Sequence, residues 1–574
     1  MKKLTVFFKG YIKETILAPV FKLLEALMDL FVPLLVAYMI NEGIAYKDNN
    51  AIIRAVLVLL ALAILGMLFS FTAQYFAAKA SVGFASRLRQ SLFEHIQSFS
   101  YKEIDNVGSD TLLTRIVSDV NQVQTGLNLA LRLLLRSPFI VFGAMIMAFT
   151  IDVKSALIFV VVIPILSLVV FYIMLKSIPL YTKAQEALDK LTKKTRENLD
   201  GVRVIRAFNQ EENEINEFVK DAENITFINK KVGSLSALMN PLTYVIINIA
   251  TIILIRNDAI YVNMGSLAQG DVVALYNYMA QIIVELIKLA SLTITINKSL
   301  ACAKRIENVL EIDSSIKYKN VTTQKHGDYK VEFNNVYFNY GNESDNAVED
   351  ISFKVKSNET IGIIGGTGSG KSTIINLIPR FYDVKSGNIK VDGVDVKDYP
   401  ESELIKKIAI VPQKAVLFTG TIRENLKWGN ENASDEELYE ALKIAQAYEV
   451  VQDKKDKLDE LVEQGGRNFS GGQRQRLTIA RALVKKPEIL ILDDSSSALD
   501  YMTDYKLRNA INKMNMTIFI VSQRSSSVMN CDKIIVLDDG KLVGFDNHEN
   551  LLKNNEVYQE IYYSQFPKEV LNEK

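Results

Sequence analysis

The sequence predicts an α-helical membrane domain of six transmembrane helices, followed by an α/β domain built around a phosphate-binding loop. Before residue 300 the chain contains six mostly apolar stretches of about 19–25 residues, each long enough to cross a ~30 Å hydrocarbon core. After residue 330 short strand-like runs appear, and one strand–helix junction carries the pattern G-x-x-x-x-G-K-S. A chain of 574 residues can hold both domains.

The expected spans lie at residues 16–40, 55–78, 133–151, 155–175, 235–255 and 272–293. A large buried soluble bundle is the alternative, but residues 55–78 contain no charged side chain, which favours a membrane span. Hydrophobic residues make up 49% of the chain. Basic and acidic residues both number 66, so no basic excess suggests a nucleic-acid partner. The lipid bilayer is the expected surroundings of this half. The two cysteines, Cys302 and Cys531, are too few for a disulfide framework.

Loop charge predicts the orientation. The connections at 41–50, 152–154 and 256–271 are short and carry one basic residue each, whereas segments 79–132 and 176–234 are long and rich in Lys and Arg. Basic residues concentrate in cytoplasmic loops. We therefore expect a multi-pass protein of the cell (cytoplasmic) membrane, with both termini and the second domain in the cytoplasm.

The two long basic segments have the pattern of helices that extend the spans inward. Each contains a less regular point where the chain could reverse, at 101–110 with Gly108 and at 200–203. Such hairpins could contact the second domain, or they could be ordinary solvated amphipathic helices.

Several ionisable residues fall inside the expected spans. Lys22, Glu25 and Asp29 share one helical stripe, and Glu285 and Lys288 are three residues apart. A charge at the bilayer centre is costly, so these groups should face the bundle interior, either paired with one another or lining a cavity. Tyr276, Tyr278 and Met279 could likewise line an apolar cavity, although core packing explains them equally well.

Residues 1–300 thus form the expected membrane domain, residues 301–328 a linker and residues 329–574 the second domain. Strands are expected at 330–340 and 352–356, a hairpin at 388–396 around Asp392 and Gly393, and buried strands at 488–492 and 516–521. A parallel α/β core places ligands at the carboxyl ends of its strands.

The phosphate-binding loop lies between the apolar strand 360–364 and a helical run that begins near residue 374. Its residues are Gly365, Gly366, Thr367, Gly368, Ser369, Gly370, Lys371, Ser372 and Thr373. Backbone N–H groups of such a loop surround phosphates at a helix N-terminus, where the helix dipole favours anions. Lys371 would reach the β- and γ-phosphates of ATP, and the Ser372 hydroxyl would bind Mg²⁺. Asp493, at the end of strand 488–492, is the expected second Mg²⁺ ligand. A Gly-rich turn with no ligand is the plain alternative.

A further motif lies between the phosphate-binding loop and Asp493. It consists of Ser470, Gly471, Gly472 and Gln473, followed by Ala480, Arg481, Ala482 and Leu483. With this signature the chain resembles an ATP-binding cassette (ABC) exporter half-transporter, over nearly its whole length. The resemblance implies that Tyr340 stacks on adenine, although a core tyrosine is the alternative. It also implies that Gln413 senses Mg²⁺ and that Asp500 belongs to a loop that crosses to the ATP-binding domain, or head, of the opposite subunit. Segments 101–110 and 200–206 would couple the two domains.

Two positions depart from the family pattern. The family's catalytic glutamate corresponds to Asp494, and its switch histidine corresponds to Gln523. Aspartate is one methylene shorter than glutamate and holds an attacking water badly, and glutamine cannot carry the charge of an imidazolium. None of the three histidines, His95, His326 and His548, replaces it by a small shift in alignment. We expect ATP binding with slow hydrolysis, while tolerance of both changes is the alternative.

In the family, two heads enclose ATP between one head's phosphate loop and the other's signature motif. The pattern resembles the degenerate-site subunit of a heterodimeric bacterial multidrug exporter, whose partner supplies the glutamate and histidine and whose substrate is an amphipathic small molecule. The alternatives are a homodimeric exporter of lipid or peptide, and an ATP-gated channel or membrane regulator.

Overall fold

The structure, a computed structural model, describes residues 4–319, 327–341, 346–495 and 497–566. It divides into two compact units. The first comprises Met1–Ser98 with Val107–Asp313, and the second comprises Phe99–Asn106 with Ser314–Lys574. Each unit encloses its own hydrophobic core.

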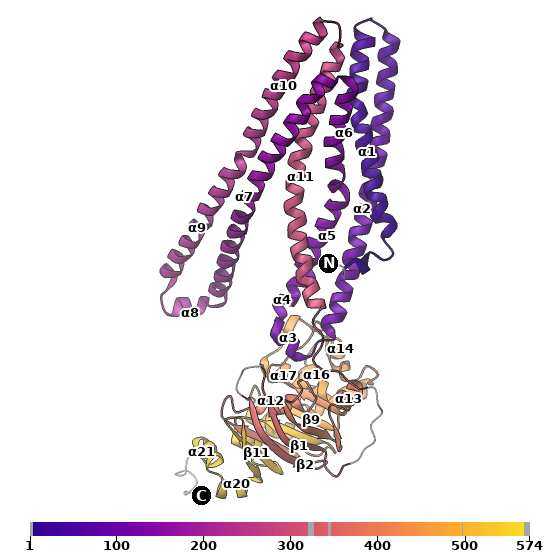
Figure 1. Cartoon of the computed structure of the whole chain (residues 1–574). Helices are drawn as coiled ribbons and strands as arrows, with labels where there is room; N and C mark the ends of the chain where they lie inside the picture. Colours follow the sequence, from indigo (N-terminus) through magenta and orange to yellow (C-terminus); the bar gives the residue numbers. More distant parts are fainter. Residues whose placement is uncertain (1–3, 320–326, 342–345, 496, 567–574) are drawn as a thin grey trace. The chain divides into compact units, whose positions relative to one another are not determined.

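The first unit is entirely helical over its described residues (Figure 1). Its elements are a 3₁₀ turn at Leu4–Phe8, α1 (Ile12–Tyr38), α2 (Asn49–Gln97), α4 (Ser109–Thr114), α5 (Val120–Leu129), α6 (Arg136–Ile151), α7 (Val153–Asp200), α8 (Val202–Ala207), α9 (Glu211–Ala237), α10 (Met239–Asn263) and α11 (Gln269–Leu310), with π-helical turns at Met39–Ile44, Arg115–Asp119 and Ala130–Leu134.

Consecutive helices join into long rods that could cross a membrane. Among the described residues there are six: Ile12–Ile44, Asn49–Gln97, Ser109–Ile151, Val153–Asp200, Glu211–Asn263 and Gln269–Leu310. Each stretch expected from the sequence lies inside one of these rods, so the prediction of six spans is confirmed. The last rod continues to Leu310, so the first residues of the expected linker are helical.

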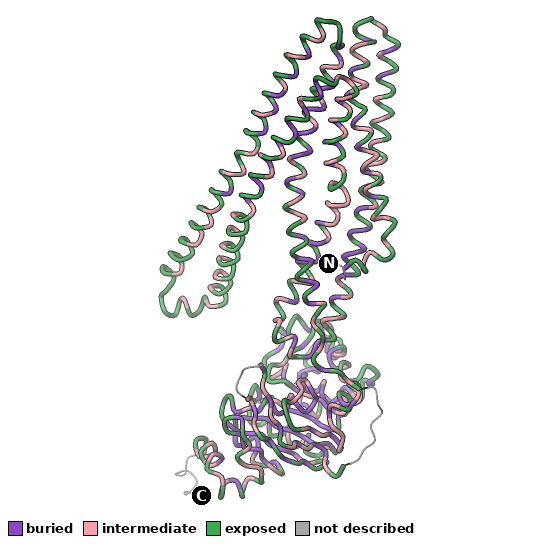
Figure 2. Tube along the Cα trace, in the orientation of Figure 1, coloured by how far each residue is buried: buried purple, intermediate pink, exposed green. Residues whose placement is uncertain are grey.

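Much of the surface of these rods is apolar and exposed. In α2, Leu57, Leu60, Ile64, Leu68 and Phe71 are all exposed, and Figure 2 shows exposed positions along the length of this helix. Soluble monomers rarely leave so large an apolar surface in contact with water, whereas lipid tails accommodate it.

The chain reverses at both points expected from the sequence. Gly108, with φ of 82°, lies between α3 (Tyr101–Val107) and α4, and α8 is the tip of the hairpin formed by α7 and α9 (Figure 1). A residue with positive φ interrupts the helical path and favours glycine, which explains the reversal at Gly108.

The second unit is built on a sheet with helices packed against it. Its strands are β1 (Val331–Phe338), β2 (Val348–Val355), β3 (Thr360–Gly365), β4 (Ser386–Val391), β5 (Val394–Asp395), β6 (Ile408–Val411), β9 (Ile489–Asp493), β10 (Thr517–Val521), β11 (Lys533–Asp538) and β12 (Lys541–Asp546), in the order β5-β4-β1-β2-β12-β11-β3-β10-β9-β6, and β7 (Gly420–Thr421) pairs with β8 (Leu461–Val462). Its helices are α3, α12 (Lys371–Leu377), α13 (Glu401–Lys407), α14 (Ile422–Lys427), α15 (Asp435–Ile444), α16 (Tyr448–Gln452), α17 (Gly471–Val484), α18 (Tyr501–Ile511), α19 (Ser525–Val528), α20 (His548–Asn554) and α21 (Glu556–Gln565), with 3₁₀ turns at Lys457–Asp459 and Gln464–Gly466.

The sheet has a parallel core and an antiparallel side. Strands β6, β9, β10, β3 and β11 run parallel, which aligns their carboxyl ends at one edge. Strands β1, β2, β4 and β5 pair antiparallel. The hairpin predicted around Asp392 and Gly393 is confirmed, and both turn residues have the positive φ of a type I′ turn.

One short segment of the first half of the chain packs within this second unit. The ring of Tyr101 in α3 stacks on that of Phe381, with centroids 4.4 Å apart. The Tyr382 hydroxyl donates a 2.7 Å hydrogen bond to Asp105. Residues of the predicted coupling segment 101–110 therefore contact the turn that follows α12.

Candidate nucleotide-binding site

A cavity of about 410 Å³ lies at the carboxyl ends of the parallel strands. It is lined by Tyr340, Ala347, Thr367, Gly368, Gly370, Lys371, Ser372, Thr373, Gln413, Asp493, Asp494, Val521, Ser522 and Gln523. The phosphate loop follows β3, Gln413 follows β6, Asp493 ends β9 and Ser522 follows β10. Parallel strands thus bring together residues that lie far apart in the sequence.

The phosphate loop depends on glycine where the backbone turns tightly. Gly370 caps α12 with φ of 93°, and a Cβ there would lie 2.8 Å from Val348 Cγ1 and 2.9 Å from Ala347 O. Gly366 differs, because a Cβ at that position would meet no atom within 4 Å. The Ser369 hydroxyl is buried and has no hydrogen-bond partner among the described residues. The loop therefore retains an unused polar group as well as a closely packed turn.

Lys371 is buried at the first position of α12. Its ammonium donates to the carbonyl oxygens of Gly365 at 2.9 Å and Gly366 at 2.5 Å. An ammonium has three donors, so one remains for a phosphate oxygen. Burial lowers the pKa of Lys371, and the nearby Asp494 and Asp493 carboxylates act in the opposite direction. A phosphate at this point would compensate the buried charge in the same way as those carboxylates.

Ser372 and Asp493 form the expected metal-binding pair. The Ser372 hydroxyl lies 3.3 Å from Asp493 Oδ1. Burial raises the pKa of Asp493, and the hydrogen bond from Ser372 and the charge of Lys371 oppose that rise only in part. A hydroxyl, a carboxylate and the Gln413 amide on one cavity wall are the oxygen donors that Mg²⁺ prefers, so these residues fit the ion.

The two unusual residues of the sequence lie in the same cavity. Asp494 has φ of 43°, and its Oδ2 accepts a 3.3 Å hydrogen bond from Gln413 Nε2. Burial raises the pKa of Asp494, and the hydrogen bond from Gln413 opposes that rise. Gln523 also lines this cavity, and its carbonyl oxygen accepts a 2.8 Å hydrogen bond from Gln565 Nε2.

No histidine is among the described residues that line this cavity. His95 Nε2 lies 2.9 Å from the carbonyl oxygen of Ile312 in the first unit, and His548 Nδ1 lies 2.7 Å from the Tyr558 hydroxyl. His326 lies outside the described residues.

Tyr340 is at the cavity wall and is 43% exposed, so it is not a core tyrosine. Its hydroxyl lies 3.0 Å from Thr373 Oγ1. The Tyr382 ring meets it edge-on, with centroids 5.2 Å apart. The partly exposed ring of Tyr340 is therefore available for stacking.

The signature motif is outside this cavity. Ser470 caps α17, and Ser470 and Gln473 exchange hydrogen bonds between side chain and backbone. Gly471 is exposed, and a Cβ there would meet no atom within 4 Å, whereas Gly472 packs near the Ala498 carbonyl. Asp500 is exposed and caps α18 through Thr503 N at 2.9 Å. The structure therefore brings the phosphate loop, Gln413, Asp493, Asp494 and Gln523 together, but not the signature or Asp500.

Three residues of the cavity wall, Ala347, Val521 and Ser522, were not expected from the sequence as site residues. Ser522 follows directly after β10 and could have been included by the same reasoning as Asp493. Ala347 precedes β2, and its backbone limits the space at Gly370, a role that no side-chain pattern signals.

Both halves of the chain are similar to known transporter domains. The family model for the ABC transporter transmembrane region matches residues 15–286, and the model for the ABC transporter family matches residues 348–497. YfiB of Bacillus subtilis, an ABC transporter ATP-binding protein, is 35% identical over 571 residues, 99% of each chain. YgaD of the same organism is 31% identical over 580 residues, 98% of each chain, and is named as a multidrug export ATP-binding/permease protein. The fold is similar to that of a bacterial Atm1-family ABC exporter with ATP bound, with a TM-score of 0.80 and 22% identity over 97% of this chain and 98% of that one.

Proposed function

This chain belongs to the ABC transporter family as a subunit of an ATP-driven exporter, and we propose that its own ATP site is a degenerate one that binds ATP but hydrolyses it slowly. The observation that supports this most directly is that Asp494 and Gln523 line the same cavity as Lys371, Ser372 and Asp493. The residues that would hold ATP are present. The residues at the two positions that handle the attacking water, Asp494 and Gln523, differ from the family pattern.

The Asp494 carboxylate is poorly suited to be a general base. It is one methylene shorter than glutamate, and the Gln413 amide donates to one of its oxygens. A general base must lie within hydrogen-bond distance of the proton that it removes, and losing it typically costs about 10²–10⁴-fold in rate. Mg²⁺, when bound, supplies positive charge to the phosphates, and Ser372, Asp493 and Gln413 would hold it.

The signature motif would act on ATP bound by another subunit. Ser470 and Gly471 are exposed at the N-terminus of α17 and do not line the cavity of their own chain. ABC half-transporters dimerise, and a partner with glutamate and histidine at the matching positions would provide one fully active site. This supports a heterodimer over a homodimer with two slow sites.

The tip of the long hairpin has the surface of a docking element for such a partner. In and beside α8, Leu199, Val204 and Phe208 are 70%, 60% and 73% exposed. Exposed apolar side chains close together at one hairpin tip suit a contact with another protein. We assign segment 200–206 to coupling with the partner's ATP-binding domain, and segment 101–110 to coupling with the chain's own.

In this mechanism ATP at both sites closes the two heads, and the coupling segments transmit that closure to the spans. Hydrolysis at the partner's site returns the transporter to its starting state. The heads and both termini are cytoplasmic in this assignment, following the basic loops. The cargo is an amphipathic small molecule of the multidrug type, which the relationship to YgaD supports.

The test is to search the neighbouring reading frames for a half-transporter with glutamate and histidine at the matching positions, and to purify this chain alone and together with it. We expect a one-to-one complex, with drug-stimulated ATPase in the complex and only slow ATPase in the chain alone. Robust stimulated ATPase from a homodimer would overturn the heterodimer. Uptake of substrate into inverted vesicles separates a pump from an ATP-gated channel, because only a pump accumulates substrate against its gradient.

A further inference from the structure

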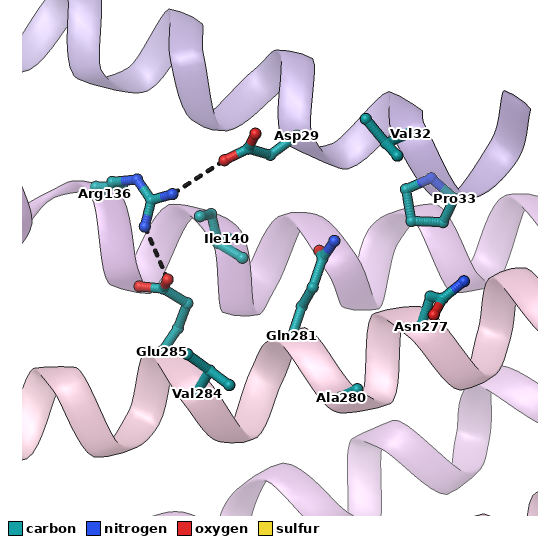
Figure 3. A pocket seen from close by; sticks show the side chains of 10 residues that line it. All are labelled: Asp29, Val32, Pro33, Arg136, Ile140, Asn277, Ala280, Gln281, Val284 and Glu285. Atoms are coloured by element: carbon teal, nitrogen blue, oxygen red, sulfur yellow. Dashed lines mark hydrogen bonds and ion pairs between the residues drawn. The ribbon is translucent and has the colours of Figure 1, made fainter. Parts of the chain in front are cut away.

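The membrane domain contains a second cavity, of about 510 Å³, between α1, α6 and α11. Figure 3 shows its lining side chains: Val32, Pro33, Ile140, Ala280 and Val284 are apolar, and Asp29, Arg136, Asn277, Gln281 and Glu285 are polar. A mostly apolar cavity with a few convergent polar groups is the usual form of a small-molecule site.

Charges on three helices are paired at one end of this cavity. Arg136 donates to Glu285 at 2.7 Å and to Asp29 at 2.9 Å (Figure 3). Lys288 also donates to Glu285, at 2.9 Å, and Lys22 pairs with Glu25. The sequence leaves open whether these groups pair or line a cavity, and the structure places Asp29 and Glu285 in both roles.

Other candidates from the last span do not contribute to this cavity. Tyr278 and Met279 are fully buried in the core, and the Tyr278 hydroxyl donates a 2.6 Å hydrogen bond to the Leu30 carbonyl. Packing therefore explains these two residues, and neither is among those lining the cavity.

Of the charged groups that line the cavity, Asp29 is the one that a ligand can reach. Its side chain is 45% exposed, against 12% for Arg136 and 5% for Glu285. Arg136 bonds one Asp29 oxygen, Oδ2, and Oδ1 has no partner among the described residues. The guanidinium of Arg136 is already shared by three carboxylates, those of Asp29, Glu285 and, at 3.8 Å, Glu25. An anion would therefore gain little from it and would be repelled by Asp29.

The amide nearest to these charges also lacks a partner. Gln281 Oε1 is buried and accepts no hydrogen bond from the described residues. A buried acceptor without a donor is costly, so a ligand that supplies an N–H group would relieve that cost. Asn277, one helical turn away on α11, adds a second amide to the same wall.

We propose that this cavity binds an amphipathic organic cation bearing N–H donors, with Asp29 as the residue that selects positive charge and Gln281 as a hydrogen-bond acceptor. The inference rests on the proposed function, since it names the chemical class of the exported molecule. The cation shares Asp29 with Arg136, and its apolar body contacts Val32, Pro33 and Val284.

The test is equilibrium binding of rhodamine 6G, a cationic fluorescent amphiphile with N–H groups, to the purified transporter in lipid nanodiscs without ATP. We expect Asp29→Asn to weaken binding at least 10-fold, Asp29→Glu to restore most of it, and Gln281→Leu to weaken it severalfold. Glu14→Gln is the matched control, because Glu14 is a carboxylate of the same helix that pairs with Lys79 and does not line the cavity. It should bind within twofold of wild type.

Fluorescein, an anionic dye of similar size, should bind at least 10-fold more weakly than rhodamine 6G. Wild-type affinity in Asp29→Asn, or tighter binding of fluorescein, would overturn the proposal. The size-exclusion profile of every variant, compared with that of wild type, reports whether the membrane domain is folded. Cation binding that depends on Asp29 but is never followed by ATP-driven transport would leave this inference intact and count against the exporter mechanism.

Discussion

Gln413 Nε2 lies 3.3 Å from Asp494 Oδ2, so the amide that follows β6 holds the carboxylate that follows β9. A hydrogen bond to the charged form stabilises the carboxylate as an ion. It also occupies an oxygen that a general base would need for water. This contact joins the residue expected to sense Mg²⁺ to the residue that departs from the family pattern.

Restoring the family residues should raise hydrolysis at this site. In the complex with the partner, we expect Asp494→Glu combined with Gln523→His to increase ATP turnover by about 10²-fold at this site, because a longer carboxylate reaches water and an imidazolium adds positive charge. Single-turnover hydrolysis with the partner's own catalytic glutamate replaced isolates the contribution of this site.

Adding Lys371→Ala to the same double variant is the control, and it should abolish the gain because Lys371 belongs to the phosphate-binding loop. An unchanged turnover in the double variant would contradict the degenerate-site proposal.

The phosphate loop offers a matched pair of glycine substitutions. Gly370→Ala should lower stability by about 1–2 kcal/mol from backbone strain alone, because φ there is 93°, and should also displace the loop, because the new Cβ would overlap Val348 and Ala347. Gly366→Ala meets no atom within 4 Å and should leave the melting temperature unchanged. Thermal unfolding with and without ATP measures both effects. Equal melting temperatures for the two variants would show that the turn at Gly370 is not as tight as its geometry indicates.

The sequence predicted the six spans and the approach of the phosphate loop to Asp493, because both depend on local patterns: long apolar runs in one case, and strand–loop–helix motifs in the other. It did not single out β6 as a strand. Residues Ile408–Val411 are too few to establish a period, and their place beside β9 depends on pairing across the sheet.

The charged residues of the spans show the same limit. The stripe of Lys22, Glu25 and Asp29 could be read from the spacing of one helix. Arg136, which joins that stripe to Glu285, lies on a different helix, and the spacing of charges along the chain predicted no role for it. Its position is set by the packing of α6 against α1 and α11, which no local pattern encodes.

The contact between α3 and the turn after α12 should contribute measurably to the stability of the second unit. The Tyr382 hydroxyl donates to Asp105 at 2.7 Å, and a hydrogen bond to a charged but exposed acceptor is worth about 1 kcal/mol. We expect Tyr382→Phe and Asp105→Asn to be less than additive, with a coupling free energy of about 1 kcal/mol in a double-mutant cycle. Because Asp105 lies in the segment that we propose couples the two domains, Tyr382→Phe should reduce drug stimulation of ATPase more than it reduces ATP affinity.

Tyr399→Phe is the control for the loss of a tyrosine hydroxyl, since that hydroxyl donates to the Val391 carbonyl within the sheet. It should lower stability without changing drug stimulation. Full additivity of the Tyr382 and Asp105 variants would mean that the hydrogen bond contributes nothing in solution.

The raised pKa of Asp493 predicts two pH dependences of opposite sign. Mg²⁺ requires the ionised carboxylate, so Mg²⁺-dependent ATP affinity should fall as the pH falls through the raised pKa, at a higher pH than for an ordinary aspartate. Without Mg²⁺, the folded state holds its proton more tightly than the unfolded state does. The resulting stabilisation is fully present below the unfolded pKa of about 3.9 and is lost as the pH rises through the folded pKa. Titrating a fluorescent ATP analogue and measuring urea unfolding across this range check the two signs.

Asp493→Asn should remove both dependences. Asp500→Asn is the control, because it keeps a helix-capping side chain and lies outside the cavity, and it should leave both dependences in place. Identical pH profiles for wild type and Asp493→Asn would refute the assignment of Asp493 as the metal-binding carboxylate.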